Sequence, residues 1–227
     1  MSGTGKAEIR GVVPRIPADP DRISAFQDAA RILKKGGLLA YPTETVYGIG
    51  ADPENAPALG RIRSLKGGSP DRMVLLVAGS EADMRPWVGD LPEPALRLMR
   101  RFWPGPLTLV FRASDRLPAA VCNERGTVAF RISPDPVCAG LVRAFGKPVV
   151  STSANPAGRE PARSAEEVLE YFKQGLDAVL DGGVRPGSAP STLVDVTSLV
   201  PVLLRRGPVP ADTIRSEIGR LDERETL

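Results

Sequence analysis

Short apolar runs alternate along this chain with segments whose apolar residues recur at helical spacing. The helical segments cover residues 21–35, 59–66, 94–103, 137–145 and 164–172, with a short one after Asp212. The apolar runs cover residues 38–41, 73–77, 107–111, 127–131, 148–150, 177–180, 192–196 and 202–205. Runs without polar alternation are typical of strands that are covered on both faces. We therefore predict an α/β protein with helices packed on an open, twisted mixed sheet.

Length and composition indicate one domain with tails. A chain of 227 residues, 42% hydrophobic and 25% charged, has enough apolar material for one substantial core. Residues 1–20 contain glycine, proline and mixed charges without periodicity, and we expect them to form a loose arm. We expect the globular domain over residues 21–210 and a helix or tail over residues 211–227.

The absence of histidine excludes several kinds of chemistry. Ser-His-Asp hydrolysis, Cys-His proteolysis and histidine-bound zinc all require a residue that this chain lacks. The two cysteines have no metal-ligand spacing. We find no apolar run as long as a membrane span and no secretory signal, so we expect a cytoplasmic protein without a membrane anchor. A net charge of +3 suits a polyanionic nucleotide and does not require a nucleic-acid partner.

Residues 41–52, YPTETVYGIGAD, place a polar segment with glycines directly after an apolar run. Pro42 has no N–H for a sheet ladder, so we expect the strand to end there. Two threonines and a glutamate at 43–45 then lie at a strand terminus, where α/β proteins commonly bind ligands. Gly48 and Gly50 allow backbone to approach a bound group. The residues alone are equally compatible with an ordinary loop between a strand and a helix.

A second polar segment, STSAN at residues 151–155, follows the apolar run at 148–150. Serine and asparagine favour a hydrogen-bonded turn, which is one interpretation of this segment. Three hydroxyls, an amide and free backbone donors also suit phosphate oxygens. Arg159 adds a cation four residues beyond Asn155.

Together, PTETVYGIG and STSAN resemble the two signatures of the YrdC-type threonylcarbamoyl-AMP synthases. The resemblance covers about residues 20–210 and implies a YrdC/RibB-like fold with a concave, positively charged face. It also implies that L-threonine, bicarbonate or CO2, and ATP are joined into L-threonylcarbamoyl-adenylate with release of pyrophosphate. In that family, downstream threonylcarbamoyl transferase proteins use the product to modify an adenosine of tRNA.

The resemblance further implies which residues bind each substrate. Thr43, Arg131 and Ser191 would orient threonine, with Arg131 on its carboxylate, because a planar guanidinium binds carboxylates through paired hydrogen bonds. The residues implied for ATP are Lys66, Arg72, Thr127, Ser151, Ser153, Asn155, Arg159 and Arg205. Taken alone, a lysine at a helix end or an arginine at a strand end also fits dipole compensation or a surface ion pair.

One loop departs from the family pattern. The family reads Lys-x-Arg-Pro from the position of Lys66, whereas this chain has Gly68 where the arginine is expected. It also lacks the histidine that many relatives place just beyond the loop as a threonine contact. We predict that Arg72 supplies the missing cation, and that Gly67 and Gly68 permit the required backbone path.

The implied reaction needs no covalent enzyme residue, so we assign none as catalytic. The threonine amine takes up CO2 to form a carbamate, and the carbamate attacks ATP. We also expect Mg2+ to bridge the phosphate oxygens of ATP, and we assign no protein ligands to it. An alternative is a YrdC-like module that binds RNA or a nucleotide without synthase activity, which Gly68 favours. A third possible function is carbamoyl-adenylate formation in metalloenzyme maturation. For that function we would expect a much longer chain with zinc fingers and an acylphosphatase module.

Overall fold

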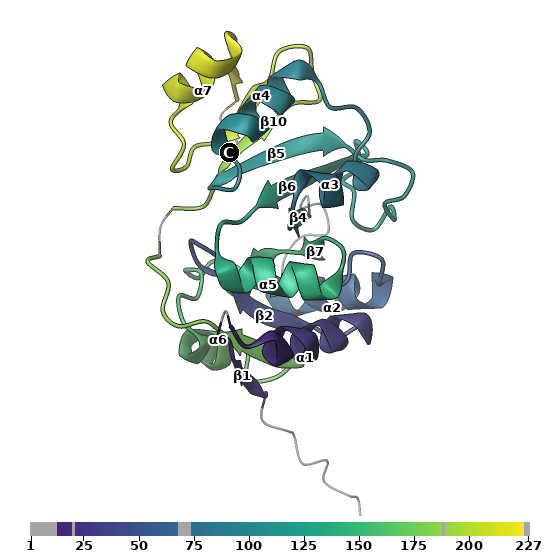
Figure 1. Cartoon of the computed structure of the whole chain (residues 1–227), viewed down its shortest axis with the longest axis vertical. Coiled ribbons are helices and arrows are strands. Elements are labelled where there is room, and N and C mark those ends of the chain that lie inside the picture. The colour runs from purple at the N-terminus through teal and green to yellow at the C-terminus, as the bar shows by residue number, and fades with distance from the viewer. Residues whose placement is uncertain (1–12, 20, 68–73, 188, 225–227) are drawn as a thin grey trace, which may run out of the picture.

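The computed structural model describes residues 13–19, 21–67, 74–187 and 189–224. Two mixed sheets lie within these residues, where we predicted a single one (Figure 1). The five-stranded sheet has the spatial order β1 (Arg15–Pro17), β9 (Ala178–Asp181), β2 (Leu39–Pro42), β3 (Tyr47–Gly50), β8 (Thr152–Ser153). The seven-stranded sheet has the order β12 (Asp222–Glu223), β11 (Val202–Arg205), β10 (Thr192–Asp195), β5 (Leu107–Arg112), β6 (Thr127–Ile132), β4 (Leu75–Ala78), β7 (Val149–Val150). The predicted α/β class with mixed strands is confirmed.

Helices pack on both sheets. They are α1 (Ile23–Lys34), α2 (Ala56–Lys66), α3 (Glu81–Met84), α4 (Glu93–Phe102), α5 (Pro136–Phe145), α6 (Ala165–Tyr171) and α7 (Ala211–Ile218), with a 3-10 turn η1 (Arg85–Trp87). Figure 1 shows α1, α2, α5 and α6 in the lower half, with the five-stranded sheet, and α3, α4 and α7 above, with the seven-stranded sheet. Among the described residues, no helix has the length and apolar character that crossing a bilayer requires.

Helices α1 and α5 lie side by side and cover the five-stranded sheet (Figure 1). The Phe26 ring of α1 is buried against α5 and lies over Gly140, where a Cβ would come within 2.7 Å of the ring. Asp135 directly precedes α5 and caps it, because its carboxylate accepts hydrogen bonds from the N–H groups of Val137 and Cys138. This cap satisfies two otherwise unpaired donors and fixes where α5 starts.

Strand β3 corrects our expectation that the segment after Pro42 is a loop. Tyr47–Gly50 pairs antiparallel with β2, so residues 43–46 form only a tight connection between two strands. The glycines that suggested a loop have a packing role instead. A Cβ at Gly50 would lie 2.7 Å from the Tyr41 ring and 2.9 Å from Val149, and both of those side chains are fully buried.

The sequence also missed short elements that have no apolar run of their own. Strand β1 lies inside the predicted loose arm, yet it pairs in parallel with β9. Strands β8 and β12 are polar and two residues long, and α3 with η1 fills a stretch we left unassigned. The strands are held by pairing with distant segments, whereas α3 has a local signal in its capping residue Ser80, which accepts a hydrogen bond from the Asp83 N–H.

Replacing Gly50 with alanine is expected to destabilise the fold by about 1–3 kcal/mol, because the added methyl overpacks a buried site. Denaturant unfolding of the purified variant measures this change. Gly60→Ala is the matched control, since no atom lies within 4 Å of a Cβ in that helical position. There alanine should stabilise by about 0.5–1 kcal/mol through helix propensity. Equal stability of the two variants would contradict the packing role of Gly50.

The chain passes from one sheet to the other at Ser151. Val149–Val150 belongs to the seven-stranded sheet and Thr152–Ser153 to the five-stranded sheet, so the second polar segment lies where the two sheets meet. Among the described strands, β3 and β4 also belong to different sheets, as do β9 and β10, and these two passages are longer. Strand ends from both sheets therefore converge around Ser151.

Candidate functional site

A cavity of about 370 Å³ opens where the two sheets meet. Its apolar wall is formed by side chains from α2 and from four strands or their flanks, chiefly Leu59, Ile62, Val74, Leu75, Ala129, Val150 and Leu193. Its polar lining comprises Thr43, Thr45, Arg63, Lys66, Thr108, Arg131, Ser151, Thr152, Ser153, Asn155, Ser191 and Arg205. Hydroxyls and cations thus face an apolar wall, an arrangement typical of small-molecule sites.

Most of the site residues named from the sequence line this one cavity. Thr43, Arg131 and Ser191, predicted for threonine, are among them. So are five of those predicted for ATP: Lys66, Ser151, Ser153, Asn155 and Arg205. The fold therefore brings together segments that are far apart in the sequence.

Three predicted residues are not placed in the cavity lining. Arg72 and the family departure at Gly68 lie outside the described residues. Thr127 is buried at the start of β6, two residues before Ala129, which does line the cavity. The exposed Arg159 has its guanidinium carbon 4.7 Å from the centre of the Tyr171 ring, an arrangement typical of a cation–π contact.

Arg131 is a buried cation near the end of β6. Its Nη1 donates a 2.7 Å hydrogen bond to Oε1 of Glu44, and the two side chains are 5% and 17% exposed. The Ser133 hydroxyl donates to the other carboxylate oxygen of Glu44, at 2.5 Å. In the described structure, Nε of Arg131 is buried and has no hydrogen-bond partner. Because buried donors are nearly always paired, this nitrogen points to a missing acceptor.

The threonines of the first polar segment close the hairpin between β2 and β3. The Thr43 hydroxyl donates to the carbonyl of Val46 at 2.8 Å and lies 3.1 Å from the Thr45 hydroxyl. Both threonines are buried and both line the cavity. The Thr43 oxygen also accepts from the N–H groups of Thr45 and Val46, at 3.3 and 3.4 Å, so these contacts fix the Thr43 hydroxyl at the cavity wall.

Ser191 is fixed by two neighbours. Its hydroxyl lies 2.7 Å from that of Thr108, and Arg205 donates to the Ser191 carbonyl from Nε (3.1 Å) and Nη2 (2.9 Å). Burial lowers the pKa of Arg205, and the charge of nearby Arg131 lowers it further. Both arginines line the cavity, and an anion bound near both guanidinium groups would relieve their repulsion.

Lys66 joins the end of α2 to the second polar segment. Helix α2 ends at Gly67, which adopts the left-handed conformation (φ 61°) that glycine tolerates best. From the last helical position, Lys66 Nζ donates to the Ser153 carbonyl and lies 3.3 Å from the Ser153 hydroxyl and 3.4 Å from Oδ1 of Asn155. A cation, hydroxyls and an amide are thus gathered at one part of the cavity lining, and this set of groups suits phosphate oxygens.

The sequence analysis missed several residues of this site. Arg63 lines the cavity one helical turn before Lys66 and donates to the Ala120 carbonyl at 2.7 Å. Thr108 lies among the apolar residues of β5, and nothing in the local sequence pattern marks it as part of a site. Glu44 was noted in the first polar segment without a role, because its pairing with Arg131 joins positions 87 residues apart.

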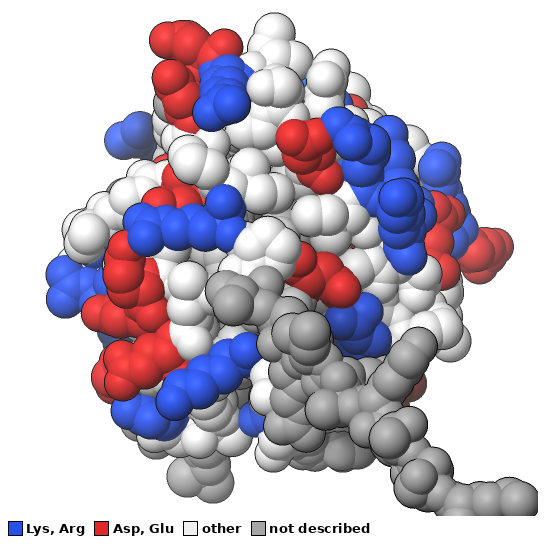
Figure 2. All heavy atoms as spheres, turned by 90° about the horizontal axis from the view of Figure 1, so that it is seen from below, with Lys and Arg blue, Asp and Glu red and all other residues white. Residues whose placement is uncertain are grey.

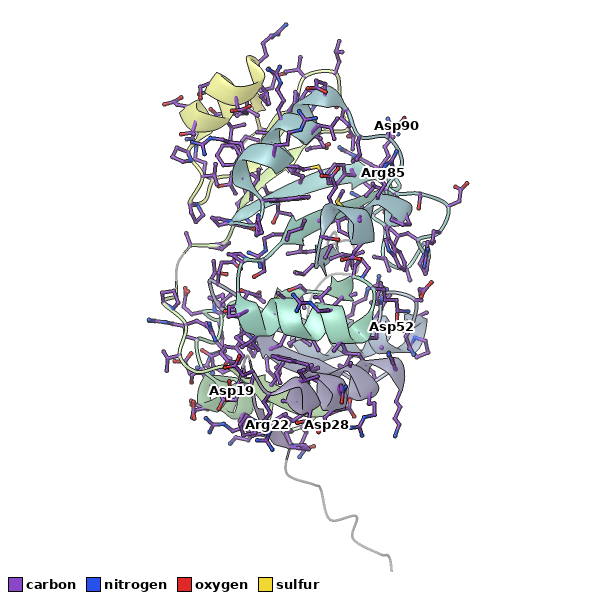
Figure 3. The ribbon with its side chains drawn as sticks, in the orientation of Figure 1. Asp19, Arg22, Asp28, Asp52, Arg85 and Asp90 are labelled. Atoms are coloured by element: carbon purple, nitrogen blue, oxygen red, sulfur yellow. The ribbon has the colours of Figure 1, made fainter. Side chains whose placement is uncertain are left out.

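Charges on the outside of the molecule are mixed. The side chains labelled in Figure 3 (Asp19, Arg22, Asp28, Asp52, Arg85 and Asp90) lie around its periphery, and none of these six lines the cavity. Figure 2 shows the end of the molecule that lies at the bottom of Figure 1, where basic and acidic side chains are interspersed. The described residues visible on that face form no continuous positive surface of the kind that nucleic acids bind.

Comparison with known proteins connects this site to one family. The family model Sua5/YciO/YrdC, described as "Telomere recombination", matches residues 31–207. A curated relative named threonylcarbamoyl-AMP synthase, from Halorhodospira halophila, is 41% identical over 167 residues. That match covers 74% of this chain and 87% of the relative.

Solved structures agree with the sequence comparison. Pyrococcus abyssi Sua5, solved in complex with L-threonine, superposes with a TM-score of 0.88 at 32% identity. That superposition covers 94% of this chain and 63% of the Pyrococcus protein, which is therefore considerably longer. Escherichia coli YciO superposes with a TM-score of 0.81 at 26% identity, covering 89% of this chain and 98% of YciO.

Proposed function

The chain belongs to the Sua5/YciO/YrdC family, and on this basis we propose that it is a threonylcarbamoyl-AMP synthase. The observation that carries the proposal is the meeting of both signature segments in one cavity. Thr43 and Thr45 come from the first segment, and Ser151, Ser153 and Asn155 come from the second. The relatives that carry this name match most of the chain, and the short ones are themselves almost fully covered.

Threonine is assigned to the end of the cavity with the two guanidinium groups. There Arg131 has a free Nε among the described residues, and Ser191 and Thr43 present hydroxyls. A carboxylate at this position would supply the acceptor that Nε lacks and would reduce the repulsion between Arg131 and Arg205. The bound L-threonine of the Pyrococcus abyssi relative supports a threonine site in this fold.

The chemistry is carried mainly by the substrates. The threonine amine adds to CO2 and loses a proton, which gives a carbamate. A carbamate oxygen then attacks the α-phosphorus of ATP, and the bond from that phosphorus to the bridging oxygen breaks to release pyrophosphate. The nucleophile is built from substrate, so a chain without histidine can perform the reaction. The protein contributes by positioning the reactants and offsetting developing charge.

ATP is assigned to the side of the cavity that Lys66 and the second signature segment form. Lys66 contacts Ser153 and Asn155, and Ser151 belongs to the same segment. Arg63 and Arg205, which is bonded to Ser191, line the same cavity as further cations. The roles of Arg72, Thr127 and Arg159 toward ATP stay predictions.

We also propose that Mg2+ takes part in the reaction, bound through the substrate rather than by a protein site. Among the described residues, no group of three or more Asp, Glu or Cys side chains comes together as a metal site. Magnesium commonly keeps water ligands and binds substrate phosphates rather than an all-protein cage. The side chains that we assign to ATP are accordingly cations, hydroxyls and an amide, and the metal would enter with the triphosphate.

The product, threonylcarbamoyl-adenylate, carries an activated threonylcarbamoyl group that a second protein has to transfer. We propose that this chain supplies threonylcarbamoyl transferase proteins that modify an adenosine of tRNA, and that it acts in the cytoplasm. Direct RNA binding without synthase activity, our alternative from the sequence, rested on Gly68, which lies outside the described residues. RNA binding would weaken steeply with added salt, whereas synthase activity depends on threonine.

Pyrophosphate release is expected to require ATP, threonine and bicarbonate together, and serine should replace threonine poorly. A pocket that contacts the threonine methyl gains only about 1–3 kcal/mol over serine, so we expect a 10- to 200-fold preference. A coupled pyrophosphate assay with each substrate omitted in turn measures both effects. Equal release without threonine would exclude the synthase function.

A further inference from the structure

Glu44 is the one member of the charged group around Arg131 that has no role so far. It lies in the connection between β2 and β3, next to two threonines that line the cavity, but Glu44 itself does not line it. Both of its carboxylate oxygens receive hydrogen bonds from the protein, Oε1 from Arg131 and Oε2 from Ser133. Its acceptor positions are therefore directed at the protein rather than at a substrate.

The way Glu44 holds Arg131 leaves part of the guanidinium unused. Glu44 contacts Nη1, whereas the buried Nε has no partner in the described part of the chain. A long arginine side chain without this contact has many rotamers, and the nearby Arg205 cation would repel it. The ion pair with Glu44 thus selects one orientation of the guanidinium and offsets the repulsion.

Glu44 is in turn held by the start of helix α5. The Ser133 oxygen that donates to Glu44 also accepts a hydrogen bond from the Asp135 N–H at 3.2 Å. Asp135 caps α5 and accepts a 2.6 Å hydrogen bond from Arg185. The Glu44 carboxylate is therefore anchored to a rigid element on one side and to a cavity residue on the other.

We propose that Glu44 is a positioning residue, which fixes the Arg131 guanidinium so that its remaining donors meet the substrate carboxylate. This inference rests on the proposed function and adds a residue that determines threonine affinity without touching threonine. A guanidinium that is displaced by about 1 Å can lose on the order of 100-fold in productive binding, so a positioning role has a large measurable effect.

The test compares Glu44→Ala and Glu44→Gln in threonine-dependent pyrophosphate release. Glu44→Ala should raise the threonine KM by about 10- to 100-fold and leave the ATP KM within about twofold. Glu44→Gln keeps an oxygen for Arg131 and an amide for Ser133, so it should recover most of the threonine affinity. In an Arg131→Ala background, Glu44→Ala should add little further loss, because the two residues act as one unit.

Glu54→Ala is the matched control. Glu54 also pairs with a cation, Lys147, but it is 42% exposed and does not line the cavity. Its variant should keep the wild-type threonine KM. If Glu44→Ala does not fold, Ser133→Ala removes the support of Glu44 and should raise the threonine KM in the same direction.

Three results would overturn the inference. They are an unchanged threonine KM in folded Glu44→Ala, equal losses toward threonine and ATP, and loss of turnover in Glu44→Gln at an unchanged threonine KM. The last result would make Glu44 an acid–base group instead. Failure of the proposed function is a separate result, since wild-type protein would then release no pyrophosphate in response to threonine.

Discussion

Arg131→Ala is expected to raise the threonine concentration for half-maximal pyrophosphate release by about 30-fold or more, with little change in the ATP requirement. Truncating one member of a buried, hydrogen-bonded charge pair costs about 2–5 kcal/mol, and each 1.4 kcal/mol corresponds to tenfold. The loss falls on threonine because we assign its carboxylate to Arg131, whereas we assign the phosphates of ATP to Lys66 and the second polar segment. Initial rates at varied threonine and saturating ATP measure it.

Arg185→Ala is the matched control for this variant. Arg185 is a partly buried arginine whose Nη1 lies 2.6 Å from the carboxylate of Asp135, and its Nε likewise has no partner among the described residues. It does not line the cavity. Both variants should lose stability, but only Arg131→Ala should lose threonine affinity. Equal increases of the threonine KM in Arg131→Ala and Arg185→Ala would show that Arg131 has only a structural role, as the partner of an ion pair.

Lys66→Met is expected to raise the ATP concentration for half-maximal activity by about 10-fold or more, because a hydrogen bond to a charged group contributes about 1.5–3 kcal/mol. Methionine keeps most of the apolar stem of lysine and removes the ammonium group with its hydrogen bonds to Ser153 and Asn155, so packing at the end of α2 is largely retained. Binding of an ATP analogue in the absence of threonine, measured by calorimetry, isolates this effect from the chemical step.

Lys147→Met serves as the control for Lys66→Met. Lys147 is a partly buried lysine with its own partners, Asp52 and Glu54, and it does not line the cavity. Its loss should lower stability and leave nucleotide affinity unchanged. An unaltered ATP affinity in Lys66→Met would remove Lys66 from the nucleotide site.

The larger elements of the fold were predictable because each carries a local pattern. The apolar stripe around Phe26 predicted α1, and continuous apolar runs predicted β5 and β6. Strand β3 was not predictable in this way, since its glycines have the composition of a loop and only the packing against Tyr41 explains them. The division into two sheets depends on which strands pair with which, and no local pattern in the sequence records that choice.

The residues of the candidate site likewise separate into those that a local motif marks and those that only tertiary contacts identify. Residues in a contiguous motif, such as Ser151, Ser153 and Asn155, could be named from the sequence and do line the cavity. Residues whose surroundings are set by tertiary contacts could not. Glu44 acquires its partner from a strand 87 positions away, and Arg159 turns to the Tyr171 ring rather than to the cavity.

The passage of the chain between sheets at Ser151 restricts insertions and deletions. Ser153 pairs opposite Gly48, and side chains of a strand alternate between its two faces. A single residue added between Val150 and Thr152 would turn Ser153 away from Lys66, because a register slip of one exchanges the faces. Residues 182–191 join the same two sheets over a longer path, so changes of length between relatives should accumulate there and be absent at Ser151.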